Sequence, residues 1–506
     1  MLADFTAGRE SHPAPKTYYI IFKMQNKSRV DFIILMCYNA DNPYSFPFYR
    51  RFYMKMIIVG CGKIGTSIIS SLVGEGNDVV AVDSSPTVID EIGNIYDVMC
   101  VCGNGADTET LEEAGVSKAD LFVAVTSSDE LNMLACFVAE RMGAKHTIAR
   151  IRNPEYNDKS LDFLSKQLGL TVSVNPEWMA AKELFNILKL PAAVNIESFS
   201  GGNLEMVELR LKQESILDGL SLIELRRKYK AQYLICAVQR GEEVYIPDGN
   251  FVLKSGDKIG ITASASEIQK LLKMLGLVQK SAKSVMILGA SRIAYYLAKR
   301  LINSGNRVIV IDKDERICRA FADELPDAVV IHGDGAEQEL LLEEGLGSVD
   351  AFVALTGMDE LNILISIFAA SQNVPKVISK VNRNELAVMA DKLGLESIVS
   401  PKKIVSDVLA RYARAINNSQ GINSIETLYR LMDGSVEALE FNVSKDFKGL
   451  KTPLKDLQLK RNMLIAGIVR GRKAIIPGGM DEILAGDRVI VIVSGNQVIE
   501  LGDILQ

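Results

Sequence analysis

The sequence lacks a hydrophobic run long enough to cross a membrane as a helix. A bilayer span needs roughly 20 successive apolar residues, and the longest candidates, such as Phe32–Tyr38, are far shorter. No small-residue cleavage site follows a single hydrophobic region, which disfavours a signal peptide. We therefore expect a soluble protein.

Reactive side chains are also scarce. The chain has only 3 histidines, and its 7 cysteines include no CxxC pair. An odd number of cysteines, lying mostly in apolar runs, predicts reduced core residues of a cytosolic protein and argues against disulfides and a zinc site. These cysteines are Cys37, Cys61, Cys100, Cys102, Cys136, Cys236 and Cys318.

An excess of charge of either sign is missing as well. The chain contains 57 Lys+Arg and 63 Asp+Glu residues, for a formal net charge of −6. A nucleic-acid partner normally requires a basic surface, so this balance argues against one.

What is present is a duplication that covers everything from Met54 onward. Corresponding residues recur at a spacing of 229 or 230 positions, so the second half repeats the architecture of the first. Two kinds of module, each used twice, account for the length, and we predict modules at 54–190, 191–280, 281–416 and 417–506. The paired landmarks are Gly60/Gly289, Asp83/Asp312, Gly103/Gly333, Asp129/Asp359, Asn132/Asn362, Pro247/Pro477 and Gly256/Gly486.

Residues 1–53 have no counterpart in the second copy and are dense in Tyr and Phe. They show neither helical nor strand periodicity for long. We interpret them as translation from an upstream start codon, with Met54 or Met56 beginning the duplicated protein. A short membrane-seeking arm is the alternative.

A nucleotide-binding motif opens the first copy. The apolar run Met56–Val59 predicts a buried parallel strand, and Gly60, Gly62 and Gly65 then give the GxGxxG turn. These glycines permit a tight turn, close approach of a pyrophosphate and helix packing, while the helix N-terminus presents its free N–H groups to phosphate. The strand VVAVD follows and ends in Asp83, where an acid is expected on the ribose hydroxyls.

An anion at Asp83 would repel a 2′-phosphate, so it favours NAD(H) or another adenosine nucleotide over NADP. The alternative is that Asp83 only caps the next turn. Strands and helices continue to alternate, which predicts a doubly wound parallel sheet of α/β type with its crevice at the carboxyl ends of the strands. Thr126 and Ser127 follow the fourth strand, and Arg150 ends the fifth.

Arg150 is interpreted as a cation that faces phosphate across the crevice, with a solvated edge charge as the alternative. His146 starts the same strand, far from the crevice, where a surface role is favoured. The next helix is predicted to have Asn175 as its N-cap and Pro176 at its first position. Its apolar face covers either the sheet of its own copy or a partner module.

Each of these domains is followed by a small α/β module of short strands. In the first copy, Val207–Leu211, Tyr233–Gln239 and Val244–Pro247 are predicted strands, and a last strand starts after Gly256. The polar stretch Gln279–Ser284 is predicted to link the two copies.

The second copy repeats the nucleotide motif with changes. Gly289 is kept, but Ser291 and Ala294 replace the second and third glycines. A Cβ at the second position intrudes where backbone should approach pyrophosphate, so we expect weaker or different binding there. Asp312 is retained, and His332 takes the place of Cys102, where a packed or ligand-facing imidazole is favoured over a catalytic one.

The order of these segments resembles a known family. The motifs GxGxxG, VVAVD, GNGAD, ADLFVAVTSSDELNMLAC and IARIRNPEY, followed by YLICAVQRGEEVYIPDGNFVLKSGDKIGI, resemble the RCK-N and RCK-C modules (regulator of potassium conductance). Their tandem duplication resembles the TrkA family of peripheral subunits of bacterial Trk potassium uptake systems. The likeness runs from Met54 to Gln506 and departs from the family at Asn104, at Ser291 and Ala294, and in residues 1–53.

The resemblance implies a Rossmann-like fold, used twice, in a cytoplasmic regulatory subunit that binds NAD(H) and ATP or ADP. It also implies a homo-oligomeric ring, a tetramer of tandem chains, that lies peripherally on the inner membrane face and gates a Trk-type potassium channel subunit. The residues it implies for the first site are Gly60, Cys61, Gly62, Lys63, Ile64, Gly65, Asp83, Thr126, Ser127 and Arg150. Those it implies for the second site are Gly289, Ala290, Ser291, Arg292, Ile293 and Asp312.

Two other functions compete with this one. An NAD-dependent oxidoreductase needs a substrate domain with an acid/base group beside the nicotinamide, and the four modules leave no room for it. A scaffold that only holds a membrane complex together would tolerate the loss of ligand binding.

The intact glycines and Asp83 generate a prediction. Gly62→Val, which fills the phosphate loop, or Asp83→Ala, which removes the ribose acceptor, should abolish the nucleotide response and leave the fold intact. Potassium flux through the partner channel, measured with and without nucleotide, checks this. A normal nucleotide response in both variants would show that the pocket is wrongly assigned.

Overall fold

The computed structural model describes residues 17–24, 32–39, 54–153, 156, 158–190, 192–212, 215–277, 282–418, 425–432, 435–495, 498 and 500–506. The chain divides into two units, Met1–Tyr53 and Met54–Gln506. The first unit contains one antiparallel pair of strands, β1 (Thr17–Met24) and β2 (Phe32–Asn39). In the described part of the chain, no helix combines the length and apolarity that a membrane crossing requires.

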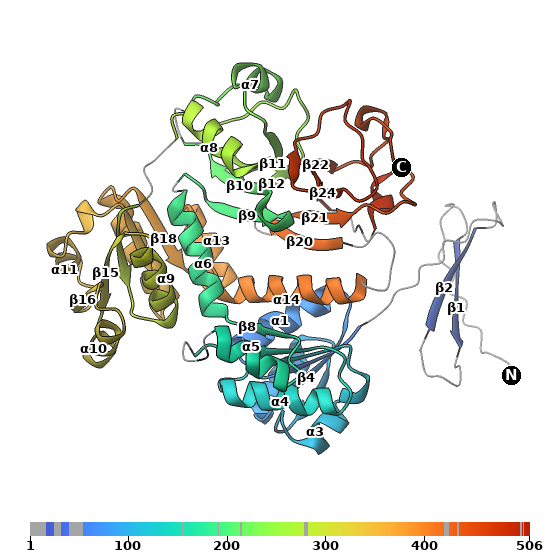
Figure 1. Cartoon of the computed structure of the whole chain (residues 1–506), viewed down its shortest axis with the longest axis horizontal. Helices are drawn as coiled ribbons and strands as arrows, with labels where there is room; N and C mark the ends of the chain where they lie inside the picture. The colour runs from blue at the N-terminus through green and yellow to red at the C-terminus, as the bar shows by residue number, and fades with distance from the viewer. Residues whose placement is uncertain are drawn as a thin grey trace, which may run out of the picture. The chain divides into compact units, whose positions relative to one another are not determined.

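A six-stranded parallel sheet with the order β5-β4-β3-β6-β7-β8 forms the first half of the second unit (Figure 1). Its strand order reverses between β3 and β6, as in doubly wound folds, which bind ligands at such a reversal. The strands are β3 (Lys55–Val59), β4 (Asp78–Asp83), β5 (Met99–Cys102), β6 (Leu121–Ala124), β7 (Thr147–Arg150) and β8 (Val172–Val174). The helices are α1 (Lys63–Gly74), α2 (Pro86–Ile95), α3 (Thr108–Glu113), α4 (Asp129–Arg141), α5 (Asp158–Gln167) and α6 (Pro176–Lys189).

The second copy repeats this topology as β16-β15-β14-β17-β18-β19, again parallel throughout. Its strands are β14 (Ser284–Leu288), β15 (Arg307–Asp312), β16 (Val329–His332), β17 (Ala351–Ala354), β18 (Lys376–Lys380) and β19 (Ser397–Val399). Its helices are α9 (Arg292–Asn303), α10 (Glu315–Glu324), α11 (Gln338–Glu343), α12 (Asp359–Ser371), α13 (Asn384–Lys392) and α14 (Pro401–Asn418). The predicted fold class is therefore confirmed. Residues 279–281 of the predicted linker lie outside the described residues, and its last residue, Ser284, begins β14.

Each small module contains a five-stranded antiparallel sheet. The first has β9 (Asn195–Phe199), β10 (Leu204–Arg210), β11 (Leu234–Arg240), β12 (Glu243–Tyr245), β13 (Lys258–Ala263), α7 (Leu222–Lys228) and α8 (Ala265–Met274). The second has β20 (Ile425–Leu431), β21 (Val436–Asn442), β22 (Met463–Arg470), β23 (Lys473–Ile475) and β24 (Arg488–Val493). The predicted strands are present, and sequence analysis missed β9.

The two small modules share one apolar core. Phe199, Met206 and Cys236 of the first pack with Ala438 and Ile490 of the second. Hydrogen bonds to buried carboxylates also connect the two small modules. Glu208 Oε1 accepts a hydrogen bond from the backbone N–H of Met432 at 3.0 Å, and Glu440 accepts from Ser200.

The two large domains exchange their last helices. Helix α6 comes from the first copy and packs on α9 of the second, while α14 comes from the second and packs on α1 of the first (Figure 1). Leu184 of α6 is buried with Ile287 and Leu297 of the second copy, and Leu409 of α14 is buried with Ile69 of the first. Of the two alternatives left open by the sequence, the structure supports docking on a partner module, and that partner is the other copy.

This exchange predicts that a mutation in one copy destabilises the other. Leu409→Ala should cost about 2–5 kcal/mol because it leaves a cavity in the first copy's core. Native-state hydrogen exchange should then show faster exchange of the β3 and β4 amides, whereas Lys403→Ala, at an exposed position of the same helix, leaves those amides unchanged. Loss of protection confined to residues 282–418 would contradict the assignment.

Candidate functional site

The first glycine turn is held by an acid and by the strand beside it. Gly60 has φ +91°, and an added Cβ would lie 2.8 Å from the backbone nitrogen of Thr126, so only glycine fits. The Asp83 carboxylate accepts hydrogen bonds from the N–H groups of Cys61 at 2.7 Å and Ser85 at 2.9 Å. Asp83 therefore caps the next turn, as the alternative reading held, and it also clamps the glycine turn. Because a carboxylate can accept about four hydrogen bonds, it retains capacity for a ribose hydroxyl.

The N-terminus of α1 is open. Gly62 is its N-cap and has no side chain to satisfy the first N–H groups, and an added Cβ would meet nothing within 4 Å. Gly65 is required for a different reason, because its added Cβ would lie 1.9 Å from the carbonyl oxygen of Gly60. Lys63 and Ile64 form the start of the helix, with Lys63 exposed. The geometry suits an anion at the helix N-terminus.

The second glycine turn keeps the acid but closes the helix end. Asp312 accepts from the N–H of Ala290 at 2.7 Å, as Asp83 does from Cys61. The Ser291 hydroxyl, however, accepts from the backbone N–H of Ala294 at 3.4 Å and caps α9. Arg292 follows as an exposed residue, and the Ile293 side chain is buried. The second site therefore satisfies with its own hydroxyl one of the N–H groups that the first site leaves open.

A buried asparagine that the sequence analysis did not assign to the site links the carboxyl ends of β6 and β7. Asn132 Oδ1 accepts from the N–H of Thr126 at 2.8 Å and from its hydroxyl at 2.7 Å, while its amide donates to the carbonyl of Arg150 at 2.9 Å. Asn362 makes the same contacts with Thr356 and the Lys380 carbonyl. The signal that identifies it is a buried polar residue repeated at the duplication spacing.

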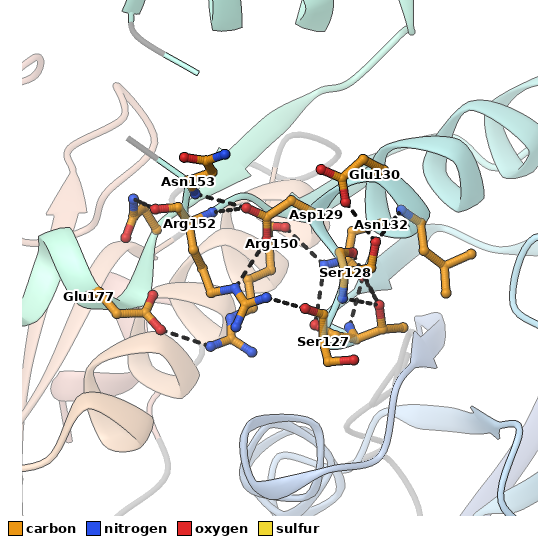
Figure 2. Close-up of polar contacts among 12 residues, drawn as sticks. Ser127, Ser128, Asp129, Glu130, Asn132, Arg150, Arg152, Asn153 and Glu177 are labelled. Atoms are coloured by element: carbon orange, nitrogen blue, oxygen red, sulfur yellow. Dashed lines mark hydrogen bonds and ion pairs between the residues drawn. The ribbon is translucent and has the colours of Figure 1, made fainter. Parts of the chain in front are cut away.

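Ser127 and Asp129 belong to a second cluster of polar contacts (Figure 2). Asp129 accepts from the N–H groups of Arg152 and Asn153, both at 2.8 Å, and from Arg152 Nε at 3.1 Å. Arg152 Nη2 also donates to the Ser127 carbonyl. This network fixes the start of α4 against the loop after β7.

Arg150 is turned toward α6 (Figure 2). Its Nη2 lies 2.9 Å from Oε1 of Glu177, and its side chain is only 12% exposed, which excludes the solvated edge charge. Burial lowers the pKa of Arg150, against the effect of Glu177. Arg150 Nε and Glu177 Oε2 are buried without a hydrogen-bond partner, so this ion pair leaves polar capacity unused.

Lys380 takes the place of Arg150 in the second copy, and Lys402 takes that of Glu177. Burial lowers the pKa of Lys380, and the neighbouring Lys63 ammonium lowers it further while Asp359 opposes both.

The thiols and imidazoles at these sites are poorly placed for chemistry. Burial, followed by the charge of Asp83, raises the pKa of Cys61 to about 12, so its thiol stays protonated. His146 packs edge-on against Tyr412, with ring centroids 6.5 Å apart. His332 is exposed, which excludes the packed imidazole, and Cys102 is exposed, so its assignment to the core was wrong. Among the described residues, no group of three or more His, Cys, Asp or Glu side chains could hold a metal ion.

Comparison with known proteins gives matches over most of the chain. The TrkA-N domain model matches residues 56–176 and 285–401, and the TrkA-C domain model matches residues 206–276 and 440–506. A Trk system potassium uptake protein TrkA homolog of Archaeoglobus fulgidus is 30% identical over 454 residues, covering 90% of this chain and 100% of the relative. The Trk system potassium uptake protein TrkA of Haemophilus influenzae is 29% identical, covering 87% and 96%.

The chain belongs to the TrkA family. The solved structure of the GsuK channel bound to NAD shares the fold, with a TM-score of 0.57 and 17% identity, covering 88% of this chain and 78% of that one. The isolated RCK domain of GsuK gives the same score and covers 88% and 94%. Along this chain the two domain models match alternately, TrkA-N then TrkA-C, twice.

The difference between the two helix ends predicts the effect of exchanging them. Ser291→Gly should strengthen nucleotide binding to the second loop several-fold because it frees an N–H group, and Gly62→Ser should weaken binding to the first. Replacing serine with glycine at an N-cap changes the free energy of unfolding by only about a few tenths of a kcal/mol. The melting temperature of each variant should therefore stay close to that of the wild type, and measuring it serves as the control. Calorimetric titration of ATP checks both variants, and unchanged affinities in both would refute the role of the open helix end.

Proposed function

We propose that the chain is the nucleotide-binding regulatory subunit of a potassium uptake channel. The observation that carries this proposal is the first glycine turn, where an uncapped helix N-terminus lies beside an acid with remaining acceptor capacity. NAD(H) and ATP or ADP are the ligands that fit it, because phosphates suit the helix end and a free ribose suits Asp83. Membership in the TrkA family supports the link to potassium uptake.

The residues proposed to contact nucleotide are those carried by the resemblance. In the first copy, Gly60 to Gly65 would hold phosphate and Asp83 would hold ribose, with Thr126 and Ser127 on the opposite wall. Arg150 would supply charge to phosphate from β7 while sharing its guanidinium with Glu177. In the second copy, Gly289 to Ile293 and Asp312 would form the weaker counterpart.

Nucleotide binding would regulate the channel because each copy packs against a helix of the other. A ligand shifts a conformational equilibrium only by its differential affinity for the two states, and coupling energies are typically about 1–3 kcal/mol. A nucleotide that prefers one orientation of the exchanged helices would change how the copies lie against each other. The channel subunit would sense that change at the inner membrane face.

A closed ring of such chains is supported by an apolar surface that both copies repeat. Leu134 of α4 is 51% exposed and its counterpart Leu364 of α12 is 65% exposed. Leu131, Phe137, Leu361 and Phe368 are half-buried on the same two helices. A chain that offers equivalent apolar faces twice can join two further copies, which suits a homo-oligomeric ring.

Regulation without catalysis predicts binding without turnover. ATP and NADH should bind to the wild-type protein, and Asp83→Ala should weaken binding at the first site at least tenfold because an acceptor in the pocket is lost. Asp312→Ala is the matched comparison, because it removes the corresponding acceptor from the second glycine turn. Calorimetric titration checks the affinities, and absorbance of NADH over hours checks turnover. Steady NADH oxidation would instead favour the oxidoreductase.

A further inference from the structure

A tyrosine of the second copy reaches the wall of the first copy's site. The Tyr296 hydroxyl donates a hydrogen bond to the carbonyl of Arg152 at 2.9 Å, and it accepts one from the side-chain amide of Asn175 at 3.1 Å. Tyr296 lies in α9, one turn beyond the second glycine loop, whereas Arg152 and Asn175 follow the carboxyl ends of β7 and β8 in the first copy.

The two residues that Tyr296 contacts are central to the first site. Arg152 is bonded through its backbone and side chain to Asp129, and it donates to the carbonyl of Ser127. Asn175 caps α6 by accepting from the Trp178 N–H at 2.9 Å. The first turn of that helix contains Glu177, which forms the ion pair with Arg150. A displacement of Tyr296 therefore acts on both the Ser127 wall and the Arg150 ion pair.

In the ranges that the structure describes, the first copy has no counterpart of the Tyr296 contact in the second copy's site. The same position in the first copy is Ser67, whose hydroxyl lies 2.8 Å from that of Ser406 in α14 and forms a bond between two helices. Tyr296 instead bonds a loop carbonyl of the other copy's site. Burial raises the pKa of Tyr296, so its hydroxyl keeps its proton and remains a donor at neutral pH.

We propose that Tyr296 is a positioning residue supplied by the second copy to the first nucleotide site, and that it makes the affinity of the first site depend on the state of the second glycine loop. Helix α9 begins at that loop, with Ser291 as its N-cap, and Tyr296 lies one turn further along the same helix. A change at Asp312 or Ser291 therefore reaches Arg152 and Asn175 through the Tyr296 hydroxyl, in addition to the packing of α9 on α6. The proposal rests on the nucleotide-binding function proposed above.

The test is a double-mutant cycle on the full-length protein, with ATP as the probe. First-site affinity is measured by calorimetry and by the fluorescence of Trp178, the only tryptophan, which stands on α6 with Arg300 of α9 over its ring at 4.9 Å. Tyr296→Phe should weaken first-site binding about two- to tenfold, the range expected for one hydrogen bond. Combined with Asp312→Ala, the effects should be non-additive, because both variants interrupt the same connection.

Tyr295→Phe is the matched control, since Tyr295 lies beside Tyr296. Within the described part of the chain, its hydroxyl forms a hydrogen bond only with the exposed Lys299, which donates at 3.5 Å. Its effects should add to those of Asp312→Ala. Additive behaviour of Tyr296→Phe with Asp312→Ala would overturn the coupling, and unchanged first-site affinity would overturn the positioning role. Absence of ATP binding in the wild type would overturn the proposed function itself, which the wild-type titration reveals separately.

Discussion

The structure depends on the exchange of two helices between the copies. Helix α6 completes the core of the second large domain, and α14 completes that of the first. Each sheet buries one face against a helix that its own copy does not supply, so neither copy is complete alone. Since hydrophobic burial dominates the free energy of folding, we infer that the two copies fold as one cooperative unit. A displacement of one sheet then changes the packing of the other.

Both copies keep this exchange of helices, whereas their glycine turns differ. Asp83 and Asp312 hold their glycine turns through the same hydrogen bond, at 2.7 Å in both copies. The difference lies at the helix ends, where Gly62 leaves N–H groups open and Ser291 satisfies one internally. An ion pair joins Arg150 to α6 in the first copy, whereas two lysines occupy the matching positions in the second. The first copy thus has both the more open anion site and the salt bridge to an exchanged helix.

Local features were predictable from the sequence because local chemistry fixes them. Gly60, Asp83 and the cap Asn175 act within a turn or on an adjacent strand, so motif and spacing revealed them. Partners from distant segments were not predictable. The amphipathic pattern of α6 predicts that its apolar face is buried, but it does not identify the surface that buries it. Periodicity likewise does not predict the ion pair between Arg150 and Glu177 or the hydrogen bond from Tyr296 to the Arg152 carbonyl.

Asn132 escaped assignment for a related reason. Its role is to satisfy buried backbone groups of Thr126 and Arg150, which requires knowing that β6 and β7 end side by side. Polar residues of this kind become visible only when the duplication is examined for what both copies retain.

Crystal structures of the full-length protein with ATP and with NADH test the central claim most directly. The account predicts nucleotide at the first glycine turn, with phosphate at Gly62 and ribose at Asp83, and an orientation of α6 and α14 that differs from that in crystals grown without nucleotide. An empty site at saturating nucleotide, or the same arrangement of the exchanged helices with and without nucleotide, would contradict it.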